Sequence, residues 1–146
     1  MQRTQRLTMA QALVRHLAAL HVETNDGSVQ PYFGGVFAIF GHGNVAGIGE
    51  ALYAKAPPRP GCAPTNNQVM PIAAVPYGKA HFRERAMAVT TSIGPGATNL
   101  VTTAAMAHVN RLPLLMLPGD VFASRAPDAV LPQLEGFHHG DLSAND

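Results

Sequence analysis

The chain has 146 residues, of which 47% are apolar and 13% charged, and this composition suits a single globular domain over residues 1–146. Its ten basic and nine acidic residues are scattered and give a net charge of +1, so we expect neither nucleic acid nor a membrane as partner. Cys62 is the only cysteine, which excludes an intramolecular disulfide. Without a signal-type segment or a run of about eighteen apolar residues, the sequence predicts a cytoplasmic protein.

The amino-terminal part predicts a helix followed by a strand. Thr8 and, three residues later, Gln11 resemble a capping box, and apolar residues recur at helical spacing from Met9 onward. Residues 23–35 are rich in turn-forming residues. The unbroken apolar run VFAIF, Val36 to Phe40, is typical of a parallel strand that is covered on both faces.

The middle of the chain is less regular. A second helix is predicted from Val45 to Lys55, and the Pro-rich segment from Ala56 to Asn67 predicts a loop. Residues 68–82 have partial helical spacing but contain Pro71 and Pro76. Because a proline inside a helix removes a backbone donor and costs ~3 kcal/mol, the sequence leaves open whether this segment is helical.

The second half of the chain alternates between strand and helix. A strand is predicted from Met87 to Thr91, a helix from Ala97 to Asn110 and a strand from Leu112 to Leu117, and the tail from Val121 onward is polar and loop-like. Strands separated by helices predict an α/β fold with a Rossmann-like parallel sheet and helices on both faces.

Three turns directly follow the predicted strands: GHGN (Gly41 to Asn44), SIGPG (Ser92 to Gly96) and PGDVF (Pro118 to Phe122). Because the carboxyl ends of parallel strands meet at one edge of a sheet, we expect these turns to converge on one ligand-binding rim. Glycines at such positions can equally be ordinary strand-to-helix connectors. The spacings GxGxxG and GxxxxGK[ST] are absent, which disfavours a nucleotide phosphate site.

The segments IFGHGN, TTSIGPGATNLVTTAAMAHVNRLPLLMLPGD and FASRAPDAVLPQLEGFHHGDLSAND, in this order, resemble the amino-terminal pyrimidine-binding domain of thiamine diphosphate enzymes. Within that superfamily they are most similar to the trihydroxycyclohexanedione hydrolases of inositol catabolism, whereas TSIGPGATN alone also resembles acetolactate synthases. The resemblance runs from Leu7 to Asp146. Because members of the family are several-fold longer, it implies the amino-terminal part of a longer enzyme.

The resemblance also implies a cofactor and partners. Thiamine diphosphate would lie between this domain of one subunit and the diphosphate-binding domain of another, so that the minimal active unit is a dimer. The implied partners are therefore a diphosphate-binding domain, of the same or another subunit, and further copies of the chain in a homo-oligomer. The accompanying Mg²⁺ would be held by that other domain, and no metal site is assigned to this chain. The substrate would be a small cyclic diketone whose carbon–carbon bond is cleaved by hydrolysis, and the chain alone would be inactive.

The resemblance places Asn67 where the family has a glutamate that hydrogen-bonds the aminopyrimidine ring. An amide can donate to a ring nitrogen but cannot share a proton with it as a carboxyl group can. Asn67 is therefore expected to border the cofactor without a catalytic role. Three alternatives remain open: a truncated enzyme, a split subunit of another thiamine diphosphate enzyme such as an acetolactate synthase-like protein, and a non-catalytic fragment.

The remaining matched positions are expected to bind ligands. Those implied to shape the turn beside the aminopyrimidine are Gly94, Pro95, Gly96 and Asn99. Those implied to lie near the substrate are Gly41, His42, Gly43 and Asn44. His42 is a candidate for proton transfer or, alternatively, a loop histidine bonded to backbone. Asp120 and Phe122 would border the same rim, and Asp120 equally suits a helix cap.

We assign no functional site to two histidines near the end of the chain or to the single cysteine. The adjacent His138 and His139 lack the spaced partners that a metal site needs. Cys62 lies in a Pro-rich loop, which favours an incidental thiol.

Overall fold

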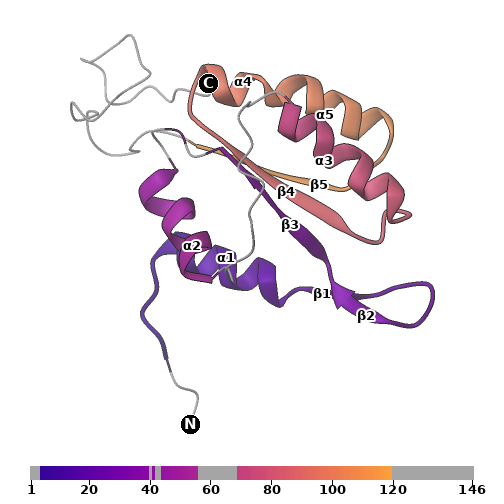
Figure 1. Ribbon diagram of the computed structural model, residues 1–146, viewed down its shortest axis with the longest axis horizontal. Helices are drawn as coiled ribbons and strands as arrows, with labels where there is room; N and C mark the ends of the chain where they lie inside the picture. Colours follow the sequence, from indigo (N-terminus) through magenta and orange to yellow (C-terminus); the bar gives the residue numbers. More distant parts are fainter. Residues whose placement is uncertain (1–3, 40, 42–43, 56–68, 120–146) are drawn as a thin grey trace.

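The computed structural model describes residues 4–39, 41, 44–55 and 69–119 (Figure 1). It begins with helix α1, Met9–Ala19, and the predicted capping box is confirmed. The Gln11 amide donates to Thr8 Oγ1 at 3.2 Å, and the Thr8 amide donates to Gln11 Oε1 at 3.1 Å. These two bonds satisfy donors that the first turn of a helix otherwise leaves unpaired.

A short antiparallel hairpin follows α1 and corrects the expectation of turns alone over residues 23–35. Its strands are β1, His21–Glu23, and β2, Val29–Pro31. The turn residues belong to the connection, which the Thr24 amide closes by donating to the Ser28 carbonyl at 2.9 Å. Strands of three residues are too short to show the alternation by which a strand is recognised in a sequence.

The main sheet has three parallel strands in the order β3, β4, β5, with bounds Phe33–Ala38, Ala86–Thr91 and Leu114–Pro118. The central strand β4 is buried along its whole length. Strand β3 begins three residues before the predicted Val36, because Phe33 also pairs with β4 across a register shift. Phe40, the predicted last strand residue, lies outside the described residues.

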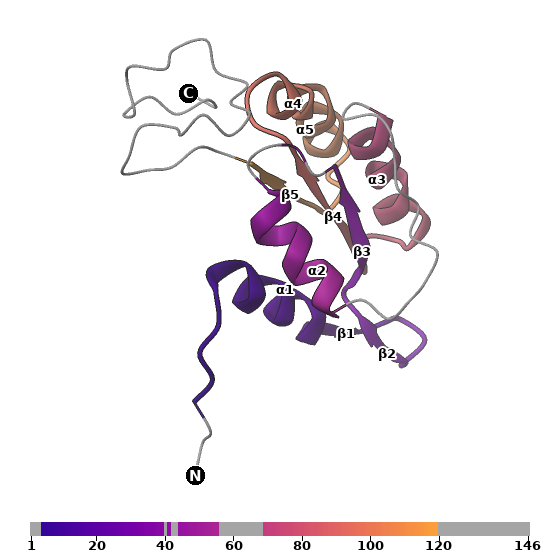
Figure 2. The same ribbon diagram turned by 60° about the vertical axis from the view of Figure 1, so that its left-hand side comes forward.

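Helices cover both faces of this sheet, which confirms the predicted fold class. Figures 1 and 2 show α3, α4 and α5 on one side and α1 and α2 on the other. The predicted helix from Val45 to Lys55 is a π-helical turn, η1, that continues into an α-helix; the one predicted from Ala97 is split at Asn99. The bounds are Val45–Gly49 for η1, Glu50–Lys55 for α2, Val69–Ala80 for α3, Pro95–Thr98 for α4 and Leu100–Val109 for α5.

Helix α3 forms despite its two prolines. Pro71 is the third residue of the helix, where a backbone N–H has no partner within the helix, so its missing donor costs nothing. Pro76 lies in the interior and is exposed. The cost of Pro76 is offset because α3 packs Ala74 and Val75 against the sheet, where their exposed fractions are 0% and 3%. Burial of this apolar face outweighs the local propensity.

The core lies between α3, α5 and the sheet. It is formed by Ala74, Met87, Val89 and Leu100, with Phe37, Tyr77, Leu114 and Met116 packed around them. Within the described ranges, each helix is too short or too polar to cross a membrane.

Candidate functional site at the carboxyl edge of the sheet

The three turns that follow β3, β4 and β5 meet at one edge of the sheet. A Cβ built on Gly41 would overlap the Cβ of Ser92 and lie 2.8 Å from its Cα. A Cβ built on Gly119 would lie 3.0 Å from Asn44 Nδ2 and 3.1 Å from the Thr91 carbonyl oxygen. The expected convergence on one rim is therefore present, and it depends on small residues where the turns touch.

Asn44 connects these turns through its side chain. Its exposed fraction is 7%, and its Nδ2 donates to Thr90 Oγ1 at 2.6 Å and to the Thr91 carbonyl at 2.9 Å. The Thr91 carbonyl also accepts from the Gly119 amide at 3.1 Å. One carbonyl at the end of β4 thus receives a donor from the turn after β3 and another from the turn after β5.

The SIGPG segment forms a tight turn that only glycine suits. Gly94 has φ 52° and ψ −118°, close to the first central residue of a type II′ turn, and the Gly96 amide donates to the Ile93 carbonyl at 3.2 Å. Pro95 then occupies the first position of α4, where its fixed φ favours helix entry. Asn99 Nδ2 donates to the Pro95 carbonyl at 3.0 Å and so stabilises the turn itself.

A buried hydroxyl without a hydrogen-bond partner lies at the end of β4. Thr91 is 1% exposed, and its Oγ1 has no partner. Thr90 and Ser92, on either side of it, are also buried. Thr90 and Thr91 were not among the predicted site residues, although two polar residues at the end of the apolar run AMAVTT point to them.

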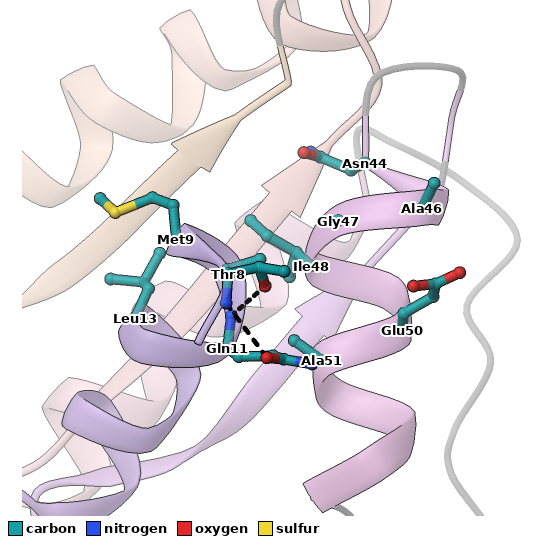
Figure 3. Close-up of a pocket in the computed structure, with 11 residues that line it drawn as sticks. Thr8, Met9, Gln11, Leu13, Asn44, Ala46, Gly47, Ile48, Glu50 and Ala51 are labelled. Carbon is teal, nitrogen blue, oxygen red and sulfur yellow. Dashed lines mark hydrogen bonds between the residues drawn. The ribbon is translucent and has the colours of Figure 1, made fainter. Parts of the chain in front are cut away.

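A pocket of about 400 Å³ adjoins the rim between the start of α1 and η1–α2 (Figure 3). Asn44 lies at its upper end, and its lining includes Met9 and Leu13 of α1 and Ile48 and Ala51 of η1–α2. Its walls are mainly apolar; Glu50, at the start of α2, also lines it, but Figure 3 shows its carboxylate directed away from α1. Asn44 is the residue that the pocket and the rim share.

The predicted site residues His42, Gly43, Asn67, Asp120 and Phe122 lie outside the described residues, as do Cys62, His138 and His139, to which no site was assigned. The predicted positions that the structure does describe, namely Gly41, Asn44, Gly94, Pro95, Gly96 and Asn99, belong to the turns after β3 and β4. Within the described part of the chain, no three His, Cys, Asp or Glu side chains are grouped as a metal site would require.

This chain belongs to the thiamine pyrophosphate enzymes, as their N-terminal TPP binding domain: residues 36–142 match that family. The match includes the strands of the parallel sheet from Val36 onward and all three turns at its carboxyl edge.

Individual relatives of this chain carry a more specific name than the family does. The chain is 48% identical over 143 residues to 3D-(3,5/4)-trihydroxycyclohexane-1,2-dione hydrolase 1 of Bacillus cereus, and 49% identical to 3D-(3,5/4)-trihydroxycyclohexane-1,2-dione hydrolase of Geobacillus thermodenitrificans. Each alignment covers 98% of this chain but only 22% of the relative. No solved structure matches this chain significantly.

Proposed function

We propose that this chain is the cofactor-binding amino-terminal portion of a thiamine diphosphate-dependent hydrolase that acts on a trihydroxycyclohexane-1,2-dione. The observation that carries the proposal is the convergence of Gly41, Ser92 and Gly119 on one rim, in a chain 48% identical to hydrolases of that name. Because the chain spans about a fifth of their length, the catalytic unit would need further residues.

The rim offers small and polar groups of the kind that border a flat heterocycle. Gly94 and Gly96 carry no side chains and are buried, so the turn itself is compact. The unpaired Thr91 hydroxyl adds a polar group just behind the turn. When bound, thiamine diphosphate would supply the nucleophilic carbon for carbon–carbon cleavage, while the protein supplies position and electrostatics.

In this proposal each turn has a distinct task. The turn from Gly94 to Asn99 would border the aminopyrimidine, with the Asn99–Pro95 bond keeping its shape. The turn from Gly41 to Asn44 would face the substrate, and His42 would be the candidate for moving a proton there. The packing of Gly41 against Ser92 would set the spacing between cofactor and substrate.

The proposed partners rest on the family and on the 22% of the relative's length that the chain covers. A diphosphate-binding domain, in the same or another subunit of a homo-oligomer, would complete the site and hold Mg²⁺. The proposed compartment is the cytoplasm, since the single cysteine gives no support for an oxidising one.

Asn67 favours a second candidate: a fragment or split subunit that binds the cofactor without turning it over. In this candidate the amide of Asn67 contacts the ring, but it has no carboxyl group with which to exchange a proton. A split subunit of an acetolactate synthase-like protein with Asn67 would likewise lack this carboxyl group.

Calorimetric titration with thiamine diphosphate and Mg²⁺ tests the proposal. We expect weak or no binding by the chain alone, and measurable binding once the remaining part of the Bacillus cereus hydrolase is added as a separate polypeptide. Absence of binding in both arms would contradict the proposal. Ring opening of the dione by the chain alone would contradict the proposal that the catalytic unit needs further residues. Cofactor binding without turnover would favour the second candidate.

A further inference from the structure

We propose that Asn44 is the positioning residue of the rim: its buried amide holds the turns after β3, β4 and β5 in one fixed arrangement. The expectation from the sequence was a contact between this residue and the substrate. In the structure both hydrogens of its amide are used inside the protein, on Thr90 Oγ1 and on the Thr91 carbonyl.

The geometry requires an amide donor at this point. The Thr91 carbonyl can only accept, so the group that faces it at 2.9 Å must be the nitrogen of Asn44. Carboxylates have no hydrogen to offer, and a glutamine would bring its amide one methylene too far. Since Asn44 is only 7% exposed, losing either bond would leave a polar group without water to replace its partner.

The same residue fixes the neighbouring segments. Gly119, after β5, packs against Asn44 Nδ2 and donates its amide to the carbonyl that Asn44 also contacts. The backbone carbonyl of Asn44 accepts from the Gly49 amide at 2.9 Å, which anchors η1. A displacement of Asn44 would therefore move the rim and the wall of the 400 Å³ pocket together.

Amide hydrogen exchange on the 146-residue chain tests this role without any ligand. In Asn44→Ala we expect the Gly119 amide to exchange at least about tenfold faster, because a lost buried hydrogen bond changes local opening by about that factor. The Ala86 amide, bonded to Tyr32 at the opposite end of β4, should keep its rate. Asn110→Ala is the matched control, since it too loses an amide-to-carbonyl bond, at 2.8 Å to Met106, but on the surface.

Equal acceleration at Gly119 and Ala86 would indicate general destabilisation and overturn the proposal, as would no change at Gly119. If Asn44→Ala does not fold, Thr90→Val removes one of the two acceptors, and Thr90→Ser should restore protection of Gly119. Failure of the serine variant to restore it would also overturn the proposal.

The identity of the ligand at the rim rests on the proposed function, and a second experiment therefore measures cofactor affinity. In the mixture with the remaining hydrolase polypeptide, Asn44→Ala should lose at least about tenfold in thiamine diphosphate affinity relative to Asn110→Ala. Unchanged affinity would overturn the positioning role at the rim. If the unaltered chain binds no cofactor even in this mixture, the proposed function fails, while the exchange experiment still decides the role of Asn44.

Discussion

Gly41, after β3, lies so close to Ser92, after β4, that a Cβ on the glycine would overlap the serine Cβ. These two residues are 51 positions apart in the sequence, yet their turns are in direct contact. The absence of a side chain at Gly41 is therefore a condition for the rim to form.

Replacing this glycine should destabilise the protein. In Gly41→Ala the new methyl group meets backbone and Cβ atoms, so the turns must separate; we expect the free energy of unfolding to fall by about 1–3 kcal/mol. Denaturant unfolding measures it. Gly47→Ala is the control, since a Cβ there meets nothing within 4 Å and alanine favours helix by up to about 1 kcal/mol. Equal losses in both variants would contradict the steric explanation.

The turn at Gly94 should be sensitive to any side chain because of its positive φ. Gly94→Ala forces an L-residue to φ 52° and ψ −118°, with an expected cost of about 1–3 kcal/mol. Gly27→Ala provides the comparison: its φ is 79°, and its surroundings are open. Both variants should lose stability, measured by thermal unfolding, but only Gly94→Ala should weaken thiamine diphosphate binding. Equal affinity in the two variants would remove the SIGPG turn from the site.

Asn67→Glu tests whether the missing carboxyl group limits catalysis. Under the proposed function, the variant combined with the remaining hydrolase polypeptide should hydrolyse the dione at least about a hundredfold faster than the unaltered chain, the scale of a general acid–base contribution. Steady-state rates measure this, and Asn67→Gln serves as the control of similar size without a proton to share. Equal rates for both variants would exclude this explanation of Asn67.

Pro76 should lower the stability of α3. Pro76→Ala restores a backbone donor inside the helix, and because the residue is exposed, no packing is lost. We expect the free energy of unfolding to rise by about 2 kcal/mol. This is the cost of a proline inside a helix, reduced because alanine leaves the unfolded chain more conformational freedom than proline does. Pro71→Ala should bring no such gain, because Pro71 lies in the first turn. Midpoints of denaturant unfolding compare the two variants. A lower stability of Pro76→Ala than of the unaltered chain would show that the proline stabilises α3.

Asp26 should make the hairpin turn sensitive to acid. The Thr24 hydroxyl, and then the Ser28 amide, donate to its carboxylate and lower the pKa of Asp26 from 3.8 to about 2. Because the folded pKa lies below the unfolded one, this stabilisation is complete above pH 3.8 and is lost as the pH falls toward 2. An NMR titration of the carboxyl carbon measures the pKa. In Thr24→Val it should rise toward 3.8, and an unchanged value would contradict the assigned cause.

Elements that form for local reasons could be predicted from the order of the residues alone. The capping box at Thr8 depends on residues three apart, and the apolar runs around Val36, Val89 and Leu115 suffice to predict strands. The order of strands and helices then predicted the parallel sheet and the edge where its turns meet. Physically, these features depend on periodicity and neighbouring hydrogen bonds, which a linear pattern contains.

Features that depend on partners distant in the sequence became visible only in the folded chain. Helix α3 keeps Pro76 because Ala74 and Val75 are buried on the sheet, and Asn44 turns inward because Thr90 and Thr91 offer acceptors 46 and 47 residues away. Such gains arise from packing and from the cost of an unpaired buried group. Neither can be evaluated until the fold has placed the partners side by side.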